Sequence, residues 1–355
     1  MLPVPRRWSD LTPAWLTAAL APHFPGAQVA RVEVGDVADG TNRRARLFLR
    51  YRAGTGPATV FVKREGRVLN RLALVALGAL QSEARLFGSG VRLPLDHPQP
   101  YAAAVDARRL ATVVVMEDVT LHGAAANQAT AALTADQVLS GLRGLASLHA
   151  AYWQRPLPRE LRFVRPWRLN RIWAPVSWAS LARAERLLRA MGHRHLLPAT
   201  ARPAVLEPAF RRWATIATTV PQTLLHGDPH PGNTYTRPDA TIGFYDWQLV
   251  RAGSWVHDVG YFLVASLGVA DRRRHEAELL RAYLAELAGH GVAPPPFEDA
   301  LALYRQSAAY GLGAWLHTLS GGGFQPVDLC LVTIERFAAA YADHLGGSHF
   351  GLLSP

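Results

Sequence analysis

The stretch His226-Gly-Asp-Pro-His-Pro-Gly-Asn233, followed by Asp246 at the end of an apolar run, is the most informative part of this sequence. Counted from Asp228, Asn233 lies five positions later and Asp246 eighteen positions later. Phosphoryl transfer to a hydroxyl needs a carboxylate that accepts the hydroxyl proton. It also needs an amide and a second carboxylate that hold Mg²⁺ on the nucleotide phosphates. The three residue types and their spacing therefore predict a phosphoryl-transfer site.

Short apolar runs flank this motif. Residues 224–225 precede it and residues 242–245 lead into Asp246, and both runs are typical of strands. We therefore expect Asp228 and Asn233 on a tight loop between two strands, rigid enough to fix polar groups. A polar hairpin made only of turn-forming residues is the alternative, which accounts for Gly232-Asn233 but not for the whole set.

Lysine usage indicates a further functional residue. The chain has 38 basic residues, of which Lys63 is the one lysine and the other 37 are arginine. Lys63 ends the β-branched and aromatic run Thr59-Val-Phe-Val-Lys63, which predicts a strand. An ammonium is a compact point charge and a guanidinium is a wide planar fork, so arginine is a poor substitute between phosphates and a carboxylate. Survival of this lysine by chance is the alternative, but we interpret Lys63 as functional.

The expected partner of Lys63 is a glutamate on the helix that follows the strand. Residues 69–87 have helical length and composition, with Asn70 as the candidate cap, and Glu83 is their one acidic residue. A solvated surface position is the alternative for Glu83. The other nearby acid, Glu65, adjoins Lys63 on the same strand, so Glu83 is the better partner.

Taken together, these residues resemble the protein-kinase-like small-molecule kinases, which include aminoglycoside phosphotransferases, choline kinases and the ecdysteroid-kinase-like (CHK-kinase-like) group. Protein kinases use the same order of Asp, Asn and Asp. The His-Gly-Asp form of the loop is characteristic of the small-molecule kinases. Leu148-His-Ala-Ala-Tyr-Trp153 and Asp246-Trp247-Gln248 are similar to the ecdysteroid-kinase-like branch in particular. The resemblance spans roughly residues 30–265.

The resemblance implies an α+β, protein-kinase-like bilobal fold. Residues 1–119 are expected to form a small nucleotide-binding lobe with a five-stranded antiparallel sheet and the adenine-binding linker. Residues 120–355 are expected to form a larger, mainly helical catalytic and substrate-binding lobe. Strands are predicted at residues 29–37, 45–52, 58–64, 101–105 and 111–116. Helices are predicted from Thr12-Pro13 onward and at residues 135–152, 178–192, 204–219, 272–289, 297–318 and 327–345.

The resemblance also implies the site residues. Asp228 and His226 are the expected catalytic residues, and Asn233 and Asp246 are the expected Mg²⁺ ligands. ATP is the expected donor, bound by Lys63, Glu83, a phosphate-covering turn with Gly40, Thr41 and Asn42, and a linker with Glu117 and Val119. A plain hairpin is an equal alternative for that turn, because it has one glycine rather than three.

Three other positions have candidate roles. His226 is expected to pack beneath the loop and hold Asp228, and His230 either contacts phosphate or braces the loop. For Asp258 an ordinary helix cap is the favoured interpretation, and acceptance of N–H groups of the catalytic loop is the alternative. Asp258 follows Asp246 by only twelve positions, which is too few for the long segment with which a protein kinase seats a peptide.

Composition and charge limit the classes of function. With 355 residues, 49% of them hydrophobic, the chain is long enough for two lobes. One cysteine, Cys330, excludes an internal disulfide. No signal peptide or membrane span is apparent, which predicts a soluble cytoplasmic protein, a monomer or homodimer. The net charge of +11 comes from scattered arginines without a nucleic-acid-binding motif, so attraction of anionic ATP is a sufficient use for it.

The acceptor is the least determined element. The chain has few acids to meet a polycationic acceptor, 27 against 38 basic residues, so a bulky apolar or neutral alcohol is expected. Eight of the ten tryptophans follow residue 150, and Trp167, Trp173 and Trp178 lie in a Pro-rich stretch where they face substrate or the core. A glycine run, 321–323, shapes a pocket wall or forms a surface loop. The alternatives are an amino-alcohol kinase of aminoglycoside or choline type, and a nucleotide-binding pseudokinase that acts as an interaction module.

Overall fold

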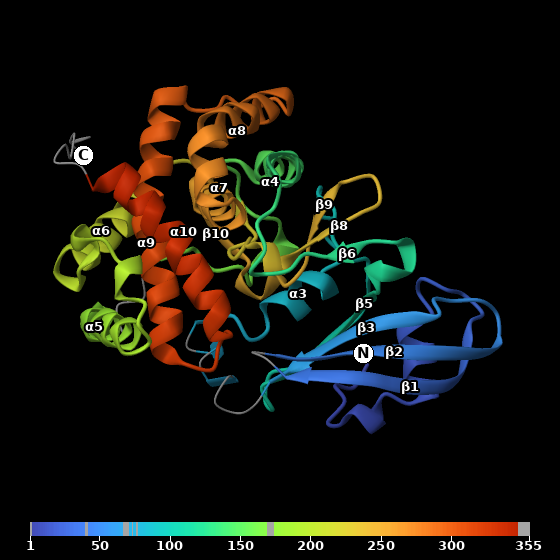
Figure 1. Ribbon diagram of the computed structural model, residues 1–355. Helices are drawn as coiled ribbons and strands as arrows, with labels where there is room; N and C mark the ends of the chain where they lie inside the picture. The colour runs from blue at the N-terminus through green and yellow to red at the C-terminus, as the bar shows by residue number, and fades with distance from the viewer. Residues whose placement is uncertain are drawn as a thin grey trace. The chain divides into compact units, whose positions relative to one another are not determined.

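The computed structural model describes residues 2–39, 42–66, 71–72, 74–75, 77–168 and 174–346 (Figure 1). The chain divides into two compact units. The first unit consists of Met1–Ala125, Leu157–Arg165 and Phe244–Val250. The second unit consists of Ala126–Pro156, Pro166–Gly243 and Arg251–Pro355. Both units are therefore discontinuous in sequence, and the lobe boundary at residues 119 and 120 stays a prediction.

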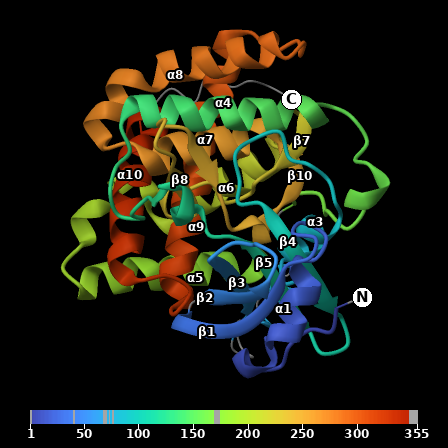
Figure 2. The ribbon, with the colours of Figure 1, turned by 90° about the vertical axis from the view of Figure 1, so that its right-hand side faces the viewer.

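The first unit is built on the five-stranded antiparallel sheet that the sequence predicts (Figure 2). Its strands lie in the order β1-β2-β3-β5-β4. Their bounds are Gln28–Asp39 for β1, Asn42–Ala53 for β2, Thr59–Glu65 for β3, Pro100–Asp106 for β4 and Ala111–Glu117 for β5. Each predicted strand is confirmed, because β-branched and aromatic residues are well suited to a pleated, half-buried surface.

Alternation along β3 assigns its residues to two faces of this sheet. Val60 and Val62 are fully buried in a core shared with Leu16 of helix α1 (Pro13–Leu20). Lys63 has the opposite parity and therefore lies on the other face. The helix start predicted at Thr12-Pro13 is confirmed: α1 begins at Pro13, and the Thr12 hydroxyl accepts the Trp15 N–H at 3.2 Å.

The helix predicted over residues 69–87 is not continuous. Residues 71–72 and 74–75 are helical, turns follow, and helix α3 begins only at Ser82 (Ser82–Gly88). Gly78 has a φ of +64°, which is typical of a residue that ends a helix. The prediction was wrong here because composition does not reveal where a glycine leaves the helical conformation. Asn70, the candidate cap, lies outside the described residues.

The second unit is mainly helical, as expected (Figure 1). Its long helices are α4 (Ala135–Tyr152), α5 (Ala174–Ala190), α6 (Pro203–Ile216), α7 (Trp255–Ser266), α8 (Val269–Gly289), α9 (Phe297–Gly321) and α10 (Val327–Leu345). Helices α9 and α10, in red, lie side by side. Six of the seven helices were predicted. Helix α7 was not, because all of its residues are buried and it has no polar face to produce a helical period.

Short strands surround the catalytic motif. Strand β7 (Gln222–Leu225) pairs with β10 (Arg251–Ser254), while β6 (Ala125–Ala126), β8 (Thr234–Thr236) and β9 (Ile242–Phe244) form a separate sheet. The two strands predicted around the motif are therefore present, but each pairs with a strand that is too short to show a pattern in the sequence.

Two further expectations are tested by the fold. Gly322 and Gly323 are exposed, have φ angles of +66° and +71°, and a Cβ on either would meet no atom within 4 Å, which favours the surface-loop alternative. Within the part of the chain that the structure describes, no helix has both the length and the apolar character needed to cross a membrane.

Candidate active site

Lys63 is held between two carboxylates in the first unit. Its Nζ lies 2.7 Å from Oε2 of Glu83 and 2.5 Å from Oδ1 of Asp246. Burial alone disfavours the ammonium, but the charges of Asp246 and Glu83 outweigh it and the pKa of Lys63 is raised. The ion pair predicted between Lys63 and Glu83 is thus confirmed, and Lys63 stays charged at neutral pH.

Local structure fixes both carboxylates. Glu83 lies in the first turn of α3, and its Oε1 accepts the Trp247 N–H at 3.0 Å. The Trp247 ring is fully buried and donates its indole N–H to the Phe244 carbonyl at 3.2 Å. Asp246 has a φ of +66°, a conformation that L-residues rarely adopt and that is concentrated at functional sites. The tripeptide that begins with Asp246 is therefore tied to α3 on one side and to its own strand on the other.

Asp228 lies in the second unit, on the loop that follows β7. The preceding residue, Gly227, has a φ of +90°, which a side chain would strain. The Asp228 N–H donates to Nδ1 of the fully buried His226 at 3.2 Å. Asn233 donates its Nδ2 to the Asp228 carbonyl at 2.9 Å and to Asp228 Oδ2 at 3.2 Å. The loop therefore brings together Asp228, Asn233 and His226, in the arrangement expected for His226.

Asp258 anchors this loop from α7. Its Oδ2 accepts the His226 N–H at 2.6 Å and its Oδ1 accepts the Gly227 N–H at 3.0 Å. Burial alone raises the pKa of Asp258, but the hydrogen bond and charge of His149 reverse the shift and lower it. The anchoring alternative is confirmed. The favoured capping interpretation is wrong, because the N-cap of α7 is Ser254.

His149 and His230 complete the support of the loop. His149, on α4, places Nε2 3.4 Å from Asp258 and Nδ1 2.8 Å from the Tyr283 hydroxyl. In the sequence, His149 was noted only as part of a family resemblance. Its role could not be predicted, because its partner Asp258 lies 109 residues away. The Nδ1 of His230 accepts the Gly232 N–H at 3.1 Å, so His230 braces the loop.

The remaining predicted nucleotide contacts are only partly described. Gly40 and Thr41 lie outside the described residues. Asn42 donates its Nδ2 to Gln248 Oε1 at 2.8 Å, in the first unit. The Glu117 N–H donates to the Gln99 carbonyl at 2.8 Å, and Val119 begins a short 3₁₀ helix, Val119–His122. Adenine binding by this segment stays a prediction.

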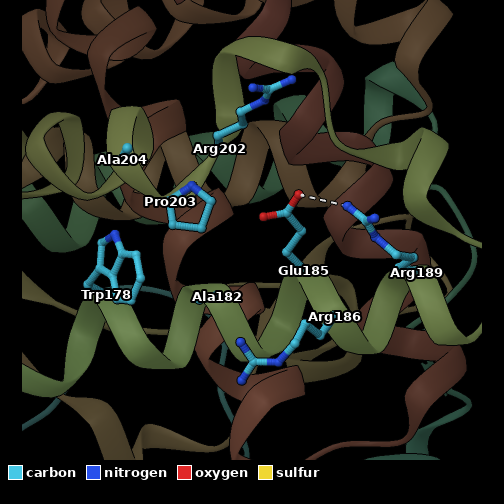
Figure 3. Close-up of a pocket in the computed structure, with 8 residues that line it drawn as sticks. All are labelled: Trp178, Ala182, Glu185, Arg186, Arg189, Arg202, Pro203 and Ala204. Carbon is cyan, nitrogen blue, oxygen red and sulfur yellow. Dashed lines mark ion pairs between the residues drawn. The ribbon is translucent and has the colours of Figure 1, made fainter.

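The tryptophans divide between the core and the surface. Trp213, Trp247 and Trp255 are fully buried, whereas Trp178 is 57% exposed. Trp178 lines a pocket of about 340 Å³ between α5 and α6, together with Glu185 and the arginines 186, 189 and 202 (Figure 3). Trp167 is partly buried, and Trp173 lies outside the described residues.

The donor atoms suit Mg²⁺ rather than a softer metal. Because Asn233 points its Nδ2 at Asp228, its amide oxygen is directed away from that residue and is a candidate neutral oxygen donor. Asp246 supplies carboxylate oxygens. Among the described residues there is no cluster of three or more acidic, histidine or cysteine ligands. Mg²⁺ bound with a nucleotide needs only one or two protein oxygens, since phosphates and water fill the other positions.

The sequence and the fold of this chain are both similar to those of known proteins. Residues 40–295 match the model of the phosphotransferase enzyme family. The structure is similar to spectinomycin phosphotransferase APH(9)-Ia, solved with ADP and spectinomycin, with 14% identity, 93% of this chain and 97% of that chain covered, and a TM-score of 0.52. It is also similar to a choline kinase from Cryptosporidium parvum Iowa II, with 11% identity, coverage of 87% and 88%, and a TM-score of 0.52. No curated protein sequence matches the chain significantly. These likenesses show the protein-kinase-like fold.

Proposed function

The chain belongs to the phosphotransferase enzyme family, and we propose that it transfers the γ-phosphoryl group of ATP to a hydroxyl of a small molecule. The observation that carries the proposal is that all five groups required for the chemistry are present. Each of them is oriented by other described residues. These groups are Lys63, Glu83, Asp228, Asn233 and Asp246.

Each group has a separate task in this proposal. Lys63 binds the nucleotide phosphates, and Glu83 keeps its ammonium in place. Asp228 accepts the proton of the acceptor hydroxyl, and Asp258 holds the backbone of the loop so that the Asp228 carboxylate keeps its direction. Asp246 and the Asn233 amide oxygen would hold Mg²⁺, which when bound neutralises charge on the phosphates.

For the acceptor we propose a bulky apolar or neutral alcohol, in keeping with the ecdysteroid-kinase-like resemblance. Aromatic side chains near Asp228 support this choice: the Trp315 ring centroid lies 5.7 Å from that of His230, and the Tyr310 ring centroid lies 4.5 Å from that of His257. An aminoglycoside- or choline-type amine is the second candidate. It is favoured only by the similarity to spectinomycin phosphotransferase and to choline kinase. We also propose that the enzyme acts in the cytoplasm, as a monomer or homodimer.

The proposal is tested by comparing wild type with Asp246→Ala and Asp228→Asn. With Mg-ATP, we expect wild type and Asp228→Asn to be stabilised against thermal unfolding, because proton acceptance and metal holding are separate tasks. Asp246→Ala should lose the Mg-dependent part of this stabilisation. ADP release with a library of hydroxylated metabolites should occur in wild type and be lost in Asp228→Asn.

Two outcomes contradict the proposal. A wild type that shows no Mg-dependent stabilisation and no ADP release would favour the pseudokinase alternative. Efficient phosphorylation of proteins without small-molecule turnover would favour a protein kinase.

A further inference from the structure

A row of aromatic side chains begins beside the catalytic loop of the second unit. Its first member is Trp167, whose backbone N–H donates to the Ala252 carbonyl of β10 at 2.6 Å. Strand β10 pairs with β7, which leads into the Asp228 loop. A Cβ on Gly253 would lie only 3.0 Å from the Trp167 Cβ, so this glycine permits the close approach. Trp167 is therefore fixed by the backbone beside the loop, although it lies in no regular element.

Tyr310 of α9 is the second member of the row. Its ring centroid lies 5.4 Å from that of Trp167 and 4.5 Å from that of His257. His257 in turn places Nε2 3.4 Å from the carbonyl of Gly227, the residue before Asp228. Trp167 and Tyr310 are both partly exposed, and they lie next to the catalytic loop.

Phe210 and His317 extend the row away from the loop. The Phe210 ring stacks on Tyr310 with centroids 5.7 Å apart and meets the His317 ring edge-on at 5.9 Å. Phe210 reaches α9 because Gly313 has no side chain: a Cβ there would lie 2.6 Å from Phe210 Cδ2. The partly exposed His317 bonds Ser180 Oγ through Nδ1 at 2.9 Å and Ser177 Oγ through Nε2 at 3.3 Å. The far end of the row is therefore polar and hydrogen-bonding.

We propose that the partly exposed Trp167 and Tyr310, backed by the buried Phe210, form the wall of the acceptor subsite, with His317 and Ser180 at its distal end. This inference rests on the proposed function. Aromatic rings present apolar faces that bind the flat faces of other rings. A neutral imidazole donates from one ring nitrogen and accepts at the other. The serine that accepts the imidazole N–H does not use its own O–H in that bond, so this O–H can donate to a ligand oxygen.

The row therefore selects a class of acceptor. A rigid, apolar, cyclic alcohol would place its reacting hydroxyl at Asp228, its rings along the row and a carbonyl or second hydroxyl at Ser180. The nearby acid Glu207 is paired with Arg211, so it is not a free carboxylate for a cationic acceptor.

The test uses two 3-hydroxysteroids as probes: androsterone, which has a distal ketone, and androstan-3α-ol, which lacks it. Choline and kanamycin serve as cationic comparison substrates. Turnover is measured by ADP release. Binding is measured by quenching of tryptophan fluorescence in wild type and in Asp228→Asn, which separates binding from phosphorylation.

Variants of the row test each part of the subsite. Tyr310→Ala and Trp167→Ala should raise KM for androsterone about tenfold, which corresponds to about 1.4 kcal/mol, with KM for ATP unchanged. Tyr310→Phe retains the ring and should retain the KM of wild type. Gly313→Ala should raise the same KM by displacing Phe210, without touching Asp228. His317→Leu should abolish the preference for androsterone over androstan-3α-ol.

Trp178→Ala is the matched control, because Trp178 is an exposed tryptophan of the same unit that lines a different pocket (Figure 3). It should leave KM for androsterone unchanged. Thermal unfolding of every variant confirms that it is folded.

The outcomes separate the subsite from the proposed function. If wild type binds the steroid without phosphorylating it, and Tyr310→Ala and Trp167→Ala abolish this binding, the subsite is retained and the proposed kinase activity is rejected. Turnover of androsterone with an unchanged KM in both variants retains the kinase and overturns the subsite. The subsite would likewise be overturned by turnover of choline or kanamycin alone, or by an absence of steroid binding. It would also be overturned if Trp178→Ala changed the KM for androsterone as much as the variants of the row do.

Discussion

The ammonium of Lys63 meets two carboxylates in a buried environment, and this arrangement defines the chemistry at the scale of single residues. Its pairing with Glu83 was predictable from sequence, because an arginine-rich chain that keeps one lysine shows where a compact charge is required, but its pairing with Asp246 was not predicted. The same reasoning did not reveal Tyr310 or His317. Both lie on a helix with many apolar residues, and a core role accounts for them equally well in sequence.

Lys63→Arg should lose most activity although the charge is kept. The planar guanidinium does not occupy the site of an ammonium that lies 2.7 Å from Glu83 and 2.5 Å from Asp246. We expect kcat/KM to fall about 100-fold, equivalent to about 2.7 kcal/mol of transition-state stabilisation. Initial rates of ADP release measure it. Turnover near that of wild type would mean that codon usage alone explains the single lysine.

Elements were predictable where one face is buried and the other is exposed. Helix α4 was predicted from its apolar stripe with its observed bounds, Ala135–Tyr152, since its buried residues recur at helical spacing. Helix α7 offered no stripe because it is buried on all sides. Strands β8 and β10 have three and four residues, too few for any period, and exist because other strands pair with them.

Helix packing in the second unit depends on individual glycines, which leads to a prediction for α9. A Cβ on Gly311 would lie 1.9 Å from Cε1 of the buried Phe337 on α10, so Gly311→Ala forces the two helices apart. We expect the free energy of unfolding to fall by about 1–3 kcal/mol, as for other overpacked sites. Chemical denaturation measures it.

Gly289→Ala on α8 is the matched control. A Cβ at Gly289 would meet no atom within 4 Å. Because alanine loses less conformational entropy in a helix, this change should stabilise the protein by about 0.4–1 kcal/mol. Equal effects of the two substitutions would show that packing of α9 on α10 does not decide the outcome.

The whole molecule should respond to pH through two histidines, the buried His257 and the partly buried His317. Burial lowers the pKa of His257 and of His317 from the ordinary value of 6.5. The unfolded chain therefore binds protons below pH 6.5 that the folded protein does not bind. The stability that these neutral side chains contribute is complete above pH 6.5 and is lost as the pH falls towards their folded pKa values.

His257→Phe should make the free energy of unfolding less dependent on pH just below 6.5. Each such histidine contributes at most about 1.4 kcal/mol per pH unit to this slope. Denaturant titrations at several pH values between 5 and 7.5 measure it, with His122→Gln as the control because the His122 side chain is 65% exposed. A slope that His257→Phe leaves unchanged, or one that His122→Gln reduces equally, would contradict the assignment.

The discontinuity of the first unit could not be predicted, because no local pattern shows that Leu157–Arg165 and Phe244–Val250 pack with residues from the N-terminal third. It has a consequence for biosynthesis. Lys63 and Asp246 are 183 residues apart in the sequence. During synthesis, Lys63 therefore leaves the ribosome long before Asp246, its second carboxylate partner, has been made. Translation must therefore pass Val250 before the first unit can close, and its final folding step is coupled to synthesis of the strands and loops that carry Asp228.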